Sequence, residues 1–208
     1  MKKSKKVKKS NTWKIKQHRD PFFKKSKTLG YRSRASFKLI ELNKKFRFIK
    51  KNSLLLDVGS APGGWSQVAS SIITNGKILA IDIEEMKLIK NVKFLKSNIL
   101  DQDTKEKVIK YFEDKIDIVV SDMAANTTGN KSLDSIRTNQ LCADIINFSK
   151  NLLKPKGVLV SKLFMGDEFI EVKKLAKSIF KNVNFFKPES SRSESKETYL
   201  HCEILKTL

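Results

Sequence analysis

The stretch from Leu54 to Gln67 reads LLLDVGSAPGGWSQ, and it decides the fold that we expect for this chain. An apolar run ends at Asp57, and a pattern that can form a helix resumes at Trp65. Between them lie the turn-forming residues Gly59, Pro62, Gly63 and Gly64. This order predicts a strand, a tight turn and a helix. Because glycines let a ligand approach the main chain and the helix start offers free N–H groups, a nucleotide-like ligand is expected at the turn.

The spacing of this turn limits the class of nucleotide-like ligand that it is expected to bind. Gly59, Ala61 and Gly64 give G-x-A-x-x-G, which departs from the dinucleotide fingerprint, and Pro62 lies where a pyrophosphate would bind. An adenosine cofactor without a pyrophosphate fits better. Such a cofactor needs an acid after the next strand to hold its ribose hydroxyls, and Asp82 in KILAIDI has that place. The glycines alone are equally compatible with a strand-to-helix turn that binds nothing.

Length and net charge indicate the number of domains and the kind of partner that we expect. The chain has 208 residues, of which 39% are hydrophobic, so it can bury one core and we expect one main domain. Lys and Arg number 43 against 22 acidic residues, and the net charge of +21 predicts a polyanionic partner. There is no run of 18 apolar residues, and the lysine-rich start lacks a hydrophobic segment. We therefore expect a cytoplasmic protein without a membrane partner.

The cysteines and histidines do not predict a metal site. Cys142 and Cys202, together with His18 and His201, do not form a recognisable zinc-binding spacing. We interpret both cysteines as reduced residues of the core and expect no structural metal.

The N-terminal residues carry most of the charge. Residues 1 to 38 contain 15 basic residues and one acid, so 15 − 1 = 14 of the +21 lies there. Aromatic side chains are interleaved with these lysines at Trp13, Phe22, Phe23 and Tyr31. Aromatic rings stack on unpaired bases while cations hold phosphates, so we expect residues 1–32 to be a basic, partly disordered arm that contacts RNA. A solubilising tail is the alternative.

The remaining residues, 33–208, read as alternating helices and strands. Ser33 is expected to cap a helix that contains Phe37, Leu39 and Leu42. Further helices are predicted at 65–73, 105–112, 135–153 and 168–180, and strands at 77–82, 92–95, 116–122, 157–164, 182–187 and 198–205. Two successive strands at the end suggest a hairpin. The expected fold is therefore α/β, a doubly wound and mostly parallel sheet with one antiparallel strand.

Polar residues follow the ends of several predicted strands. Asp82, Asp122 and Lys162 stand at strand ends, and Glu197 lies in the last loop. Any single acid there is equally compatible with a helix cap. Lys162 is different because it interrupts the apolar strand VLVSKLF, and a buried lysine is costly unless it is paired. We therefore expect Asp122 and Glu197 to be its partners.

Five blocks of sequence occur in the order HRDPFFKKSKTLGYRSRASFKLIEL, DVGSAPGGWSQ, SDMAANTTG, KLFMG and SSRSESKETY. From about Trp13 to Leu205, the chain resembles the RrmJ/FtsJ family of S-adenosylmethionine-dependent ribose 2′-O-methyltransferases. It is most similar to the bacterial branch that acts on large-subunit (23S) ribosomal RNA. The resemblance implies a Rossmann-like class I methyltransferase fold and S-adenosylmethionine as the cofactor.

The resemblance also implies roles for individual residues. The family's catalytic set falls on Lys38, Asp122, Lys162 and Glu197. The expected cofactor contacts fall on Gly59, Ser60, Pro62, Gly63, Trp65, Asp82, Ile83, Asn98 and Asp122. The chain departs from the family at Ala125, where proline is usual, and at Asn98, where aspartate is usual. The Asn98 carbonyl oxygen still accepts a hydrogen bond from an adenine amino group, so we expect an altered contact rather than a lost one.

The expected methyl transfer explains why the site needs these four residues. A ribose hydroxyl must attack a sulfonium methyl group in line, so the enzyme must hold two reactants in near-attack geometry. A desolvated Lys162 near Lys38 would accept the hydroxyl proton, whereas a charged Lys162 would orient the hydroxyl and stabilise the developing oxyanion. The sequence does not choose between these roles. It predicts that Asp122 and Glu197 orient the ammonium group and that Lys38 positions the substrate.

Three functions are consistent with the sequence. The first is methylation of a uridine ribose in the A-loop of the 23S ribosomal RNA, by a monomer that contributes to ribosome maturation and meets its RNA within the large subunit. The second is the same reaction on a transfer RNA. The third is a noncatalytic RNA-binding protein that assists ribosome assembly, which the complete set of four catalytic residues disfavours.

Overall fold

The computed structural model describes residues 20–166 and 168–206, so most of the predicted arm, residues 1–19, lies outside the described residues. The elements are α2 (Pro21–Thr28), α3 (Ala35–Phe46), β1 (Leu54–Val58), α4 (Gly64–Ile72), β2 (Lys77–Asp82), β3 (Lys93–Lys96), α5 (Gln102–Phe112), β4 (Ile116–Ser121), α6 (Lys131–Leu152), β5 (Leu153–Phe164), α7 (Phe169–Ile179), β6 (Phe180–Phe186) and β7 (Glu197–Leu205).

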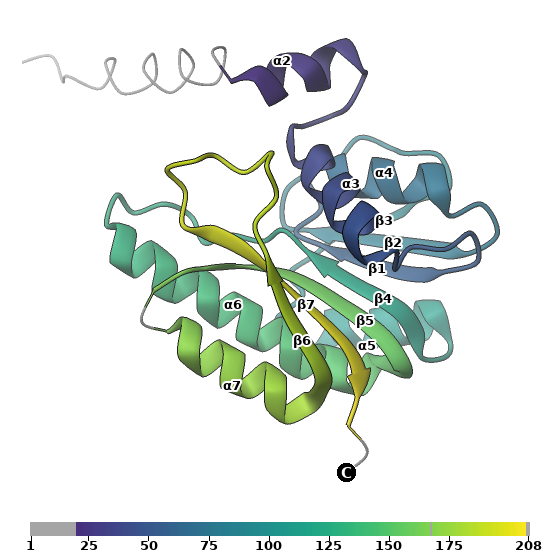
Figure 1. The fold of residues 1–208 in the computed structure, drawn as a ribbon. Coiled ribbons are helices and arrows are strands. Elements are labelled where there is room, and N and C mark those ends of the chain that lie inside the picture. Colours follow the sequence, from purple (N-terminus) through teal and green to yellow (C-terminus); the bar gives the residue numbers. More distant parts are fainter. Residues whose placement is uncertain (1–19, 167, 207–208) are drawn as a thin grey trace, which may run out of the picture.

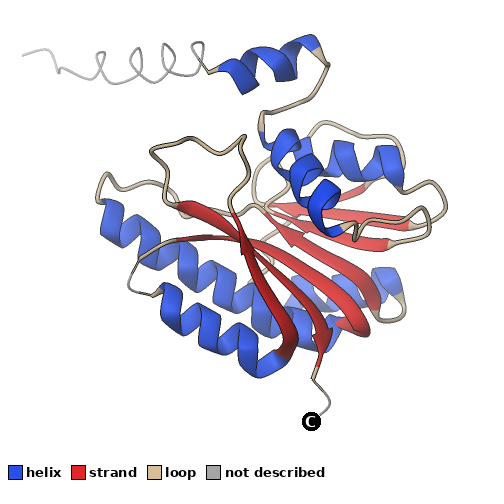
Figure 2. Ribbon diagram, viewed as in Figure 1, coloured by secondary structure: helices blue, strands red, loops and turns tan. Residues whose placement is uncertain are grey.

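Seven strands form one sheet in the order β3-β2-β1-β4-β5-β7-β6. The first five strands in this order run parallel, and β7 is antiparallel to both β5 and β6. Helices α3 and α4 lie on one face of the sheet and α5, α6 and α7 on the other (Figures 1 and 2). The predicted doubly wound α/β fold with one antiparallel strand is therefore confirmed. Among the described residues, no helix combines the length and apolar character needed to cross a membrane.

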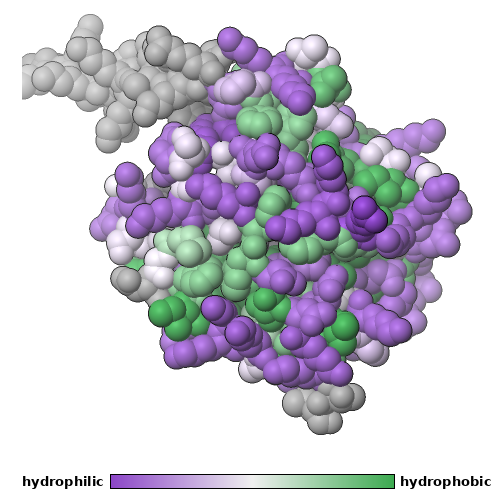
Figure 3. Space-filling view, in the orientation of Figure 1, coloured by the Kyte–Doolittle hydropathy of each residue, from purple (hydrophilic) through white to green (hydrophobic). Residues whose placement is uncertain are grey.

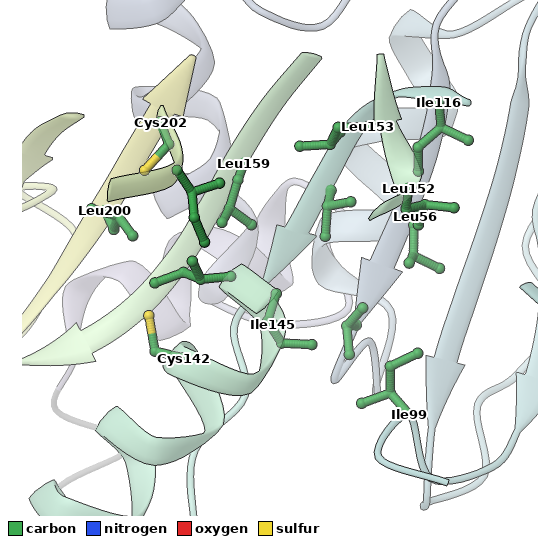
Figure 4. Packing of buried hydrophobic residues seen from close by; sticks show 14 of the residues in the cluster. Leu56, Ile99, Ile116, Cys142, Ile145, Leu152, Leu153, Leu159, Leu200 and Cys202 are labelled. Atoms are coloured by element: carbon green, nitrogen blue, oxygen red, sulfur yellow. The ribbon is translucent and has the colours of Figure 1, made fainter. Parts of the chain in front are cut away.

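Each face of the sheet carries its own hydrophobic cluster. The larger one packs α5, α6 and α7 against the strands, and Figure 4 shows Ile145 and Cys142 of α6 facing Leu159, Leu200 and Cys202. Both cysteines are free and buried, as predicted. The second cluster packs α3 and α4 on the opposite face. Because both faces are covered, β4 is buried at every position except Asp117, which is only partly buried.

The described part of the predicted arm, residues 20–32, contains a helix that the sequence patterns did not predict. Asp20 caps α2, because its side chain accepts hydrogen bonds from the backbone N–H groups of Phe22 and Phe23, and Pro21 occupies the first turn. Asp-Pro is a helix-start signal that would have found this helix. The Phe22 and Tyr31 rings each lie with their centroids 5.5 Å from the centroid of Phe37. These two aromatic side chains thus also hold α2 to the domain.

The predicted cap of α3 is wrong. The helix begins at Ala35 with Arg34 at the cap position, and the Arg34 side chain makes no capping hydrogen bond. The hydroxyl of Ser33 is buried without a hydrogen-bond partner among the described residues. Ser33 instead contributes its carbonyl to the first turn, where it accepts from the N–H of Ser36. Its hydroxyl lies against Gly64, where a Cβ atom would meet it at 2.3 Å.

Candidate active site

Lys162 of β5 and Asp122 at the end of β4 meet at the carboxyl edge of the sheet. Their strands are neighbours, with Ser121 paired to Ser161. The Lys162 Nζ donates to the Asp122 carbonyl oxygen at 2.6 Å and lies 3.1 Å from the Asp122 Oδ1. Lys162 is only 8% exposed. The predicted pairing of a buried lysine with Asp122 is therefore present.

Helix α3 and strand β7 complete the cluster of catalytic residues that the resemblance implied. The Lys38 Nζ lies 2.8 Å from the Glu197 Oε1 and 4.0 Å from the Asp122 Oδ1. Glu197 was expected to pair with Lys162, but in the described residues it forms its ion pair with Lys38. The four residues come from four separate elements and bring two ammonium groups together with two carboxylates. We call Lys38, Asp122, Lys162 and Glu197 the ionic cluster.

Tyr199 is a further member of this site that the sequence analysis missed. Its hydroxyl donates to the Asp122 Oδ1 at 2.7 Å, and the Lys38 Nζ lies 5.5 Å from the centroid of its ring. Burial and the Asp122 carboxylate raise the pKa of the Tyr199 phenol well above its usual value, so it remains a donor. A signal was present, because Tyr199 lies two residues after Glu197 on one strand and so on the same face.

The ionic cluster changes the ionisation of Asp122. Burial alone would raise the pKa of this carboxyl group. The ammonium groups of Lys162 and Lys38 and the hydrogen bonds from Tyr199 and Lys162 outweigh that effect and hold its pKa below the usual value. Asp122 is therefore a carboxylate across the whole physiological pH range.

A cavity of about 320 Å³ opens beside the ionic cluster at the ends of β1, β2, β3 and β4. Five of the predicted cofactor contacts line it, namely Gly59, Asp82, Ile83, Asn98 and Asp122. Apolar walls are added by Ile99 and Met123. Asp122 belongs to both the cavity wall and the ionic cluster, so a ligand in the cavity would lie next to Lys162.

Hydrogen bonding joins the turn after β1 to Asp82 at the end of β2. Asp82 accepts hydrogen bonds from the N–H groups of Ala61 at 2.8 Å and Glu84 at 2.9 Å, which orient its carboxylate at the cavity. Gly59 has a φ of +74°, and a Cβ atom there would meet the Met123 Cγ at 2.4 Å. The turn can pass this close to the end of β4 only with glycine at position 59.

The other predicted cofactor residues have different surroundings. Ser60, Pro62, Gly63 and Trp65 are not among the residues that line the cavity. Trp65 is 3% exposed, and its indole N–H donates to the Ala35 carbonyl oxygen at 2.8 Å, so it joins α4 to α3. Asn98 does line the cavity, but its side-chain oxygen already accepts from the N–H of Leu100 at 3.1 Å. A lone pair of that oxygen remains for a ligand.

Asp57 is a second buried acid beside the site, and the sequence analysis gave it no role. It lies on β1, is 1% exposed, and accepts a hydrogen bond on Oδ2 from the Ser66 hydroxyl at 2.6 Å. Its Oδ1 has no hydrogen-bond partner in the described chain. Burial raises the pKa of Asp57 to about 7, and the carboxylates of Asp122 and Asp82 add to this effect.

A second group of charged residues anchors the loop between β6 and β7. Arg34 contacts the Asp20 carboxylate with one guanidinium nitrogen and the Ser190 carbonyl oxygen with another, and Arg192 lies 3.7 Å from Asp20. Glu41 accepts hydrogen bonds from the N–H groups of Glu189 at 2.6 Å and Ser190 at 3.1 Å. Helix α3 thus holds the loop that leads to Glu197.

Comparison with known proteins finds a matching family over most of the chain. A family model described as FtsJ-like methyltransferase matches residues 31–204. The chain is 43% identical over 197 residues to the "Ribosomal RNA large subunit methyltransferase E" of Pelagibacter ubique, and this match covers 95% of the chain and 97% of that protein.

Solved structures agree with this match. The crystal structure of a putative ribosomal RNA methyltransferase from Plasmodium falciparum superposes with a TM-score of 0.76 at 34% identity, covering 84% of this chain and 98% of that one. A putative methyltransferase from Streptococcus mutans in complex with SAH has a TM-score of 0.53 at 16% identity, covering 83% and 96%. The second likeness concerns the fold alone.

Proposed function

The chain belongs to the FtsJ-like methyltransferase family, and we propose that it transfers a methyl group from S-adenosylmethionine to a ribose 2′-hydroxyl of large-subunit (23S) ribosomal RNA. We propose a uridine of the A-loop as the target, and a contribution of its methylation to ribosome maturation. The relative from Pelagibacter ubique carries the name of a large-subunit ribosomal RNA methyltransferase, which supports this class of substrate. The net charge of +21 supports RNA as the partner.

The cavity residues fit S-adenosylmethionine. The Asp82 carboxylate, already held by two backbone N–H groups, keeps lone pairs that would accept from the ribose hydroxyls. Ile83 is 62% exposed at the cavity, and an adenine ring would cover it. Asn98 would accept from the adenine amino group. When bound, the cofactor supplies a methyl group on a positively charged sulfur.

The ionic cluster would then act on the hydroxyl of the substrate. The Lys162 ammonium has three donors, and its contacts with the Asp122 carbonyl and carboxylate oxygens leave one for a ribose hydroxyl oxygen. From there it would orient the hydroxyl and stabilise the negative charge that develops on its oxygen as the proton passes to solvent water and the new O–CH3 bond forms. Asp122 and Tyr199 fix the direction of Lys162, and Glu197 holds Lys38 beside the substrate.

One observation carries the proposal. Asp122 is both a wall of the cofactor cavity and the centre of the ionic cluster. A hydroxyl held by Lys162 would therefore face a methyl group presented from the cavity, which is the arrangement that a methyl transfer requires.

Mapping of ribose methylation across total RNA, with and without the gene, tests the proposal. We expect one uridine of the 23S ribosomal RNA to lose its methyl group in the deletion strain and to regain it with the wild-type gene, but not with a Lys162→Ala gene. Loss of methylation at a transfer RNA instead would assign the alternative substrate. An unchanged map would contradict the proposed activity.

A further inference from the structure

Three side chains lie in one row across the last strands of the sheet. Tyr199 of β7 is paired with Lys162 of β5 on one side and with Phe186 of β6 on the other. Residues directly opposite each other in antiparallel strands point to the same face, so Phe186 shares the face of Tyr199 and Lys162. With neighbouring strands about 4.8 Å apart, Phe186 lies ~10 Å from Lys162 along this row. A nucleotide adjoining a ribose held at Lys162 would reach it.

Helix α3 places one lysine over each of the two aromatic rings of this row. The Lys38 Nζ lies 5.5 Å from the centroid of Tyr199, and the Lys45 Nζ lies 4.4 Å from the centroid of Phe186. The two lysines are seven residues apart and so face the same way. Their surroundings differ, because Lys38 is buried in the ionic cluster, whereas Lys45 is exposed and forms no ion pair in the described part of the chain.

The surface around Phe186 is open and basic. Phe186 is half-buried, with the Phe46 ring edge-on at a centroid distance of 6.2 Å. Lys45 over its ring and Lys187 next to it in sequence are exposed. In Figure 2, β6 and β7 lie in front while the helices of this half of the molecule lie behind the sheet. Figure 3 shows hydrophobic groups along the middle of this face, bordered by hydrophilic ones.

We propose that Phe186 and Lys45 form a binding site for an unpaired RNA base next to the methylated nucleotide. The base stacks on the Phe186 ring in the place that Lys45 occupies, and the Lys45 ammonium moves from the ring to the adjoining phosphate. Base-on-aromatic stacking is available only to bases outside a duplex. The site therefore selects single-stranded targets for the proposed RNA methylation, on which this inference rests.

Binding of a fluorescein-labelled single-stranded oligouridylate by the full chain tests the site, with fluorescence anisotropy measured over a series of salt concentrations. Phe186→Ala removes the ring, Phe186→Leu keeps apolar volume without a ring, and Phe186→Tyr keeps both. Tyr111→Ala is the matched control, because Tyr111 is also half-buried beneath a lysine, with the Lys77 Nζ 5.8 Å from its centroid, but lies away from the carboxyl edge. Thermal unfolding of each variant checks that the variant is folded.

We expect Phe186→Ala and Phe186→Leu to weaken binding about 5- to 150-fold at every salt concentration, the range for one stacked base. Phe186→Tyr and Tyr111→Ala should bind like the wild type. Lys45→Gln should reduce the slope of log affinity against log salt by ~0.7, the value for one phosphate contact.

Wild-type affinity in a folded Phe186→Leu variant would overturn the site, and so would an equal loss in Tyr111→Ala or an equal loss on a duplex of the same length. These outcomes are separate from failure of the proposed function, because oligouridylate binding is measured without methyl transfer. A wild-type chain that leaves ribosomal RNA unmethylated would refute that function alone.

Discussion

Two aspartates at neighbouring strands, the buried Asp57 of β1 and the partly buried Asp122 after β4, have pKa values shifted in opposite directions. Asp57 is 1% exposed, and burial raises its pKa to about 7. The Asp122 side chain is 18% exposed, and its pKa lies below the usual value although burial acts in the opposite direction. The difference comes from the partners. Asp57 has the Ser66 hydroxyl, whereas Asp122 has two ammonium groups and a phenol.

The comparison shows what the lysines of the ionic cluster contribute. A buried carboxyl group without a cation tends to stay protonated, as burial penalises the charged form. Lys38 and Lys162 turn the same kind of group into a fixed anion, and the anion in turn holds both lysines in place. Removal of one member of such a cluster leaves an uncompensated buried charge, which is strongly destabilising.

The largest expected effect follows from breaking the cluster at Lys162. Lys162→Ala should lower the single-turnover rate of methyl transfer ~10²- to 10⁴-fold, the scale of a lost catalytic proton or charge contact. Cofactor binding should be nearly unchanged, because Lys162 is not among the residues that line the cavity. Rapid-quench kinetics at saturating RNA and calorimetry with S-adenosylmethionine measure the two quantities.

Lys162→Arg separates the two roles of the lysine. A guanidinium keeps the positive charge but cannot accept a proton near neutral pH. Because the Lys162 ammonium already donates to two Asp122 oxygens, we expect the Arg variant to be faster than the Ala variant. An Arg variant as slow as Lys162→Ala, with an intact fold, would favour an obligatory base. Near-wild-type rates in Lys162→Ala would remove this residue from catalysis.

The second prediction concerns the other aspartate and the pH dependence of stability. A raised carboxyl pKa contributes stability that is fully present below the unfolded value of about 4 and is lost as the pH rises through about 7. Asp57→Asn removes this titration, while its amide oxygen still accepts from Ser66. Relative to the wild type, the variant should therefore gain up to about 4 kcal/mol between pH 4 and pH 7.5.

Urea unfolding of the cofactor-free protein at several pH values measures this difference. Asp103→Asn is the control, because its side chain is 75% exposed and should show little pH-dependent difference from the wild type. His201 is buried, and its pKa is lowered to about 4. Because every variant contains it, its contribution cancels in the difference in unfolding free energy between a variant and the wild type. A constant gap between Asp57→Asn and the wild type across this range would mean that Asp57 is ionised in the fold.

These two aspartates also show which features of the site can be predicted from the sequence and which cannot. The succession of strands and helices along the chain follows from hydrophobic patterns, and so does the gathering of Asp82, Asp122 and Lys162 at one edge, because parallel strands end together. The hydrogen-bond and ion-pair partners of each side chain cannot be predicted from these patterns. Nothing local to LLLDVGS predicts that the pKa of Asp57 is raised while that of Asp122 is lowered, since the deciding lysines come from α3 and β5. Glu197 pairs with Lys38 for the same reason, through packing between distant elements.

A third acid at the same edge, Asp82, is held by backbone N–H groups instead of lysines. Asp82→Ala should weaken S-adenosylmethionine binding by about 1.5 to 3 kcal/mol, the scale of lost charge-assisted hydrogen bonds. Asp82→Asn, which keeps an acceptor for the Ala61 N–H, should lose less. Calorimetry on both variants tests this order, and undiminished affinity in a folded Asp82→Ala variant would exclude Asp82 from the cofactor site.

The smallest expected effect concerns Glu41, an acid that binds backbone N–H groups of another segment. Arg34 at the cap of α3, with Lys38 and Glu41 inside the helix, has the spacing i, i+4 and i+7, so one face of the helix contacts both the β6–β7 loop and Glu197. Because Glu41 holds the N–H groups of Glu189 and Ser190, its loss should free the loop and let Glu197 drift from Lys38.

Glu41→Ala should cost about 1 to 2 kcal/mol of stability, the value of hydrogen bonds to a half-exposed carboxylate, and should slow methyl transfer without weakening cofactor binding. Glu41→Gln retains one acceptor and should recover part of both losses. Glu171→Ala is the matched control, because within residues 20–166 and 168–206 Glu171 pairs only with Lys174, on the surface of α7, and its side chain is 71% exposed. If Glu41→Ala lost stability but kept the wild-type single-turnover rate, the contact would stabilise the loop without positioning Glu197. A rate that falls together with stability, while the cofactor affinity is constant, would extend the ionic cluster to the helix face that supports it.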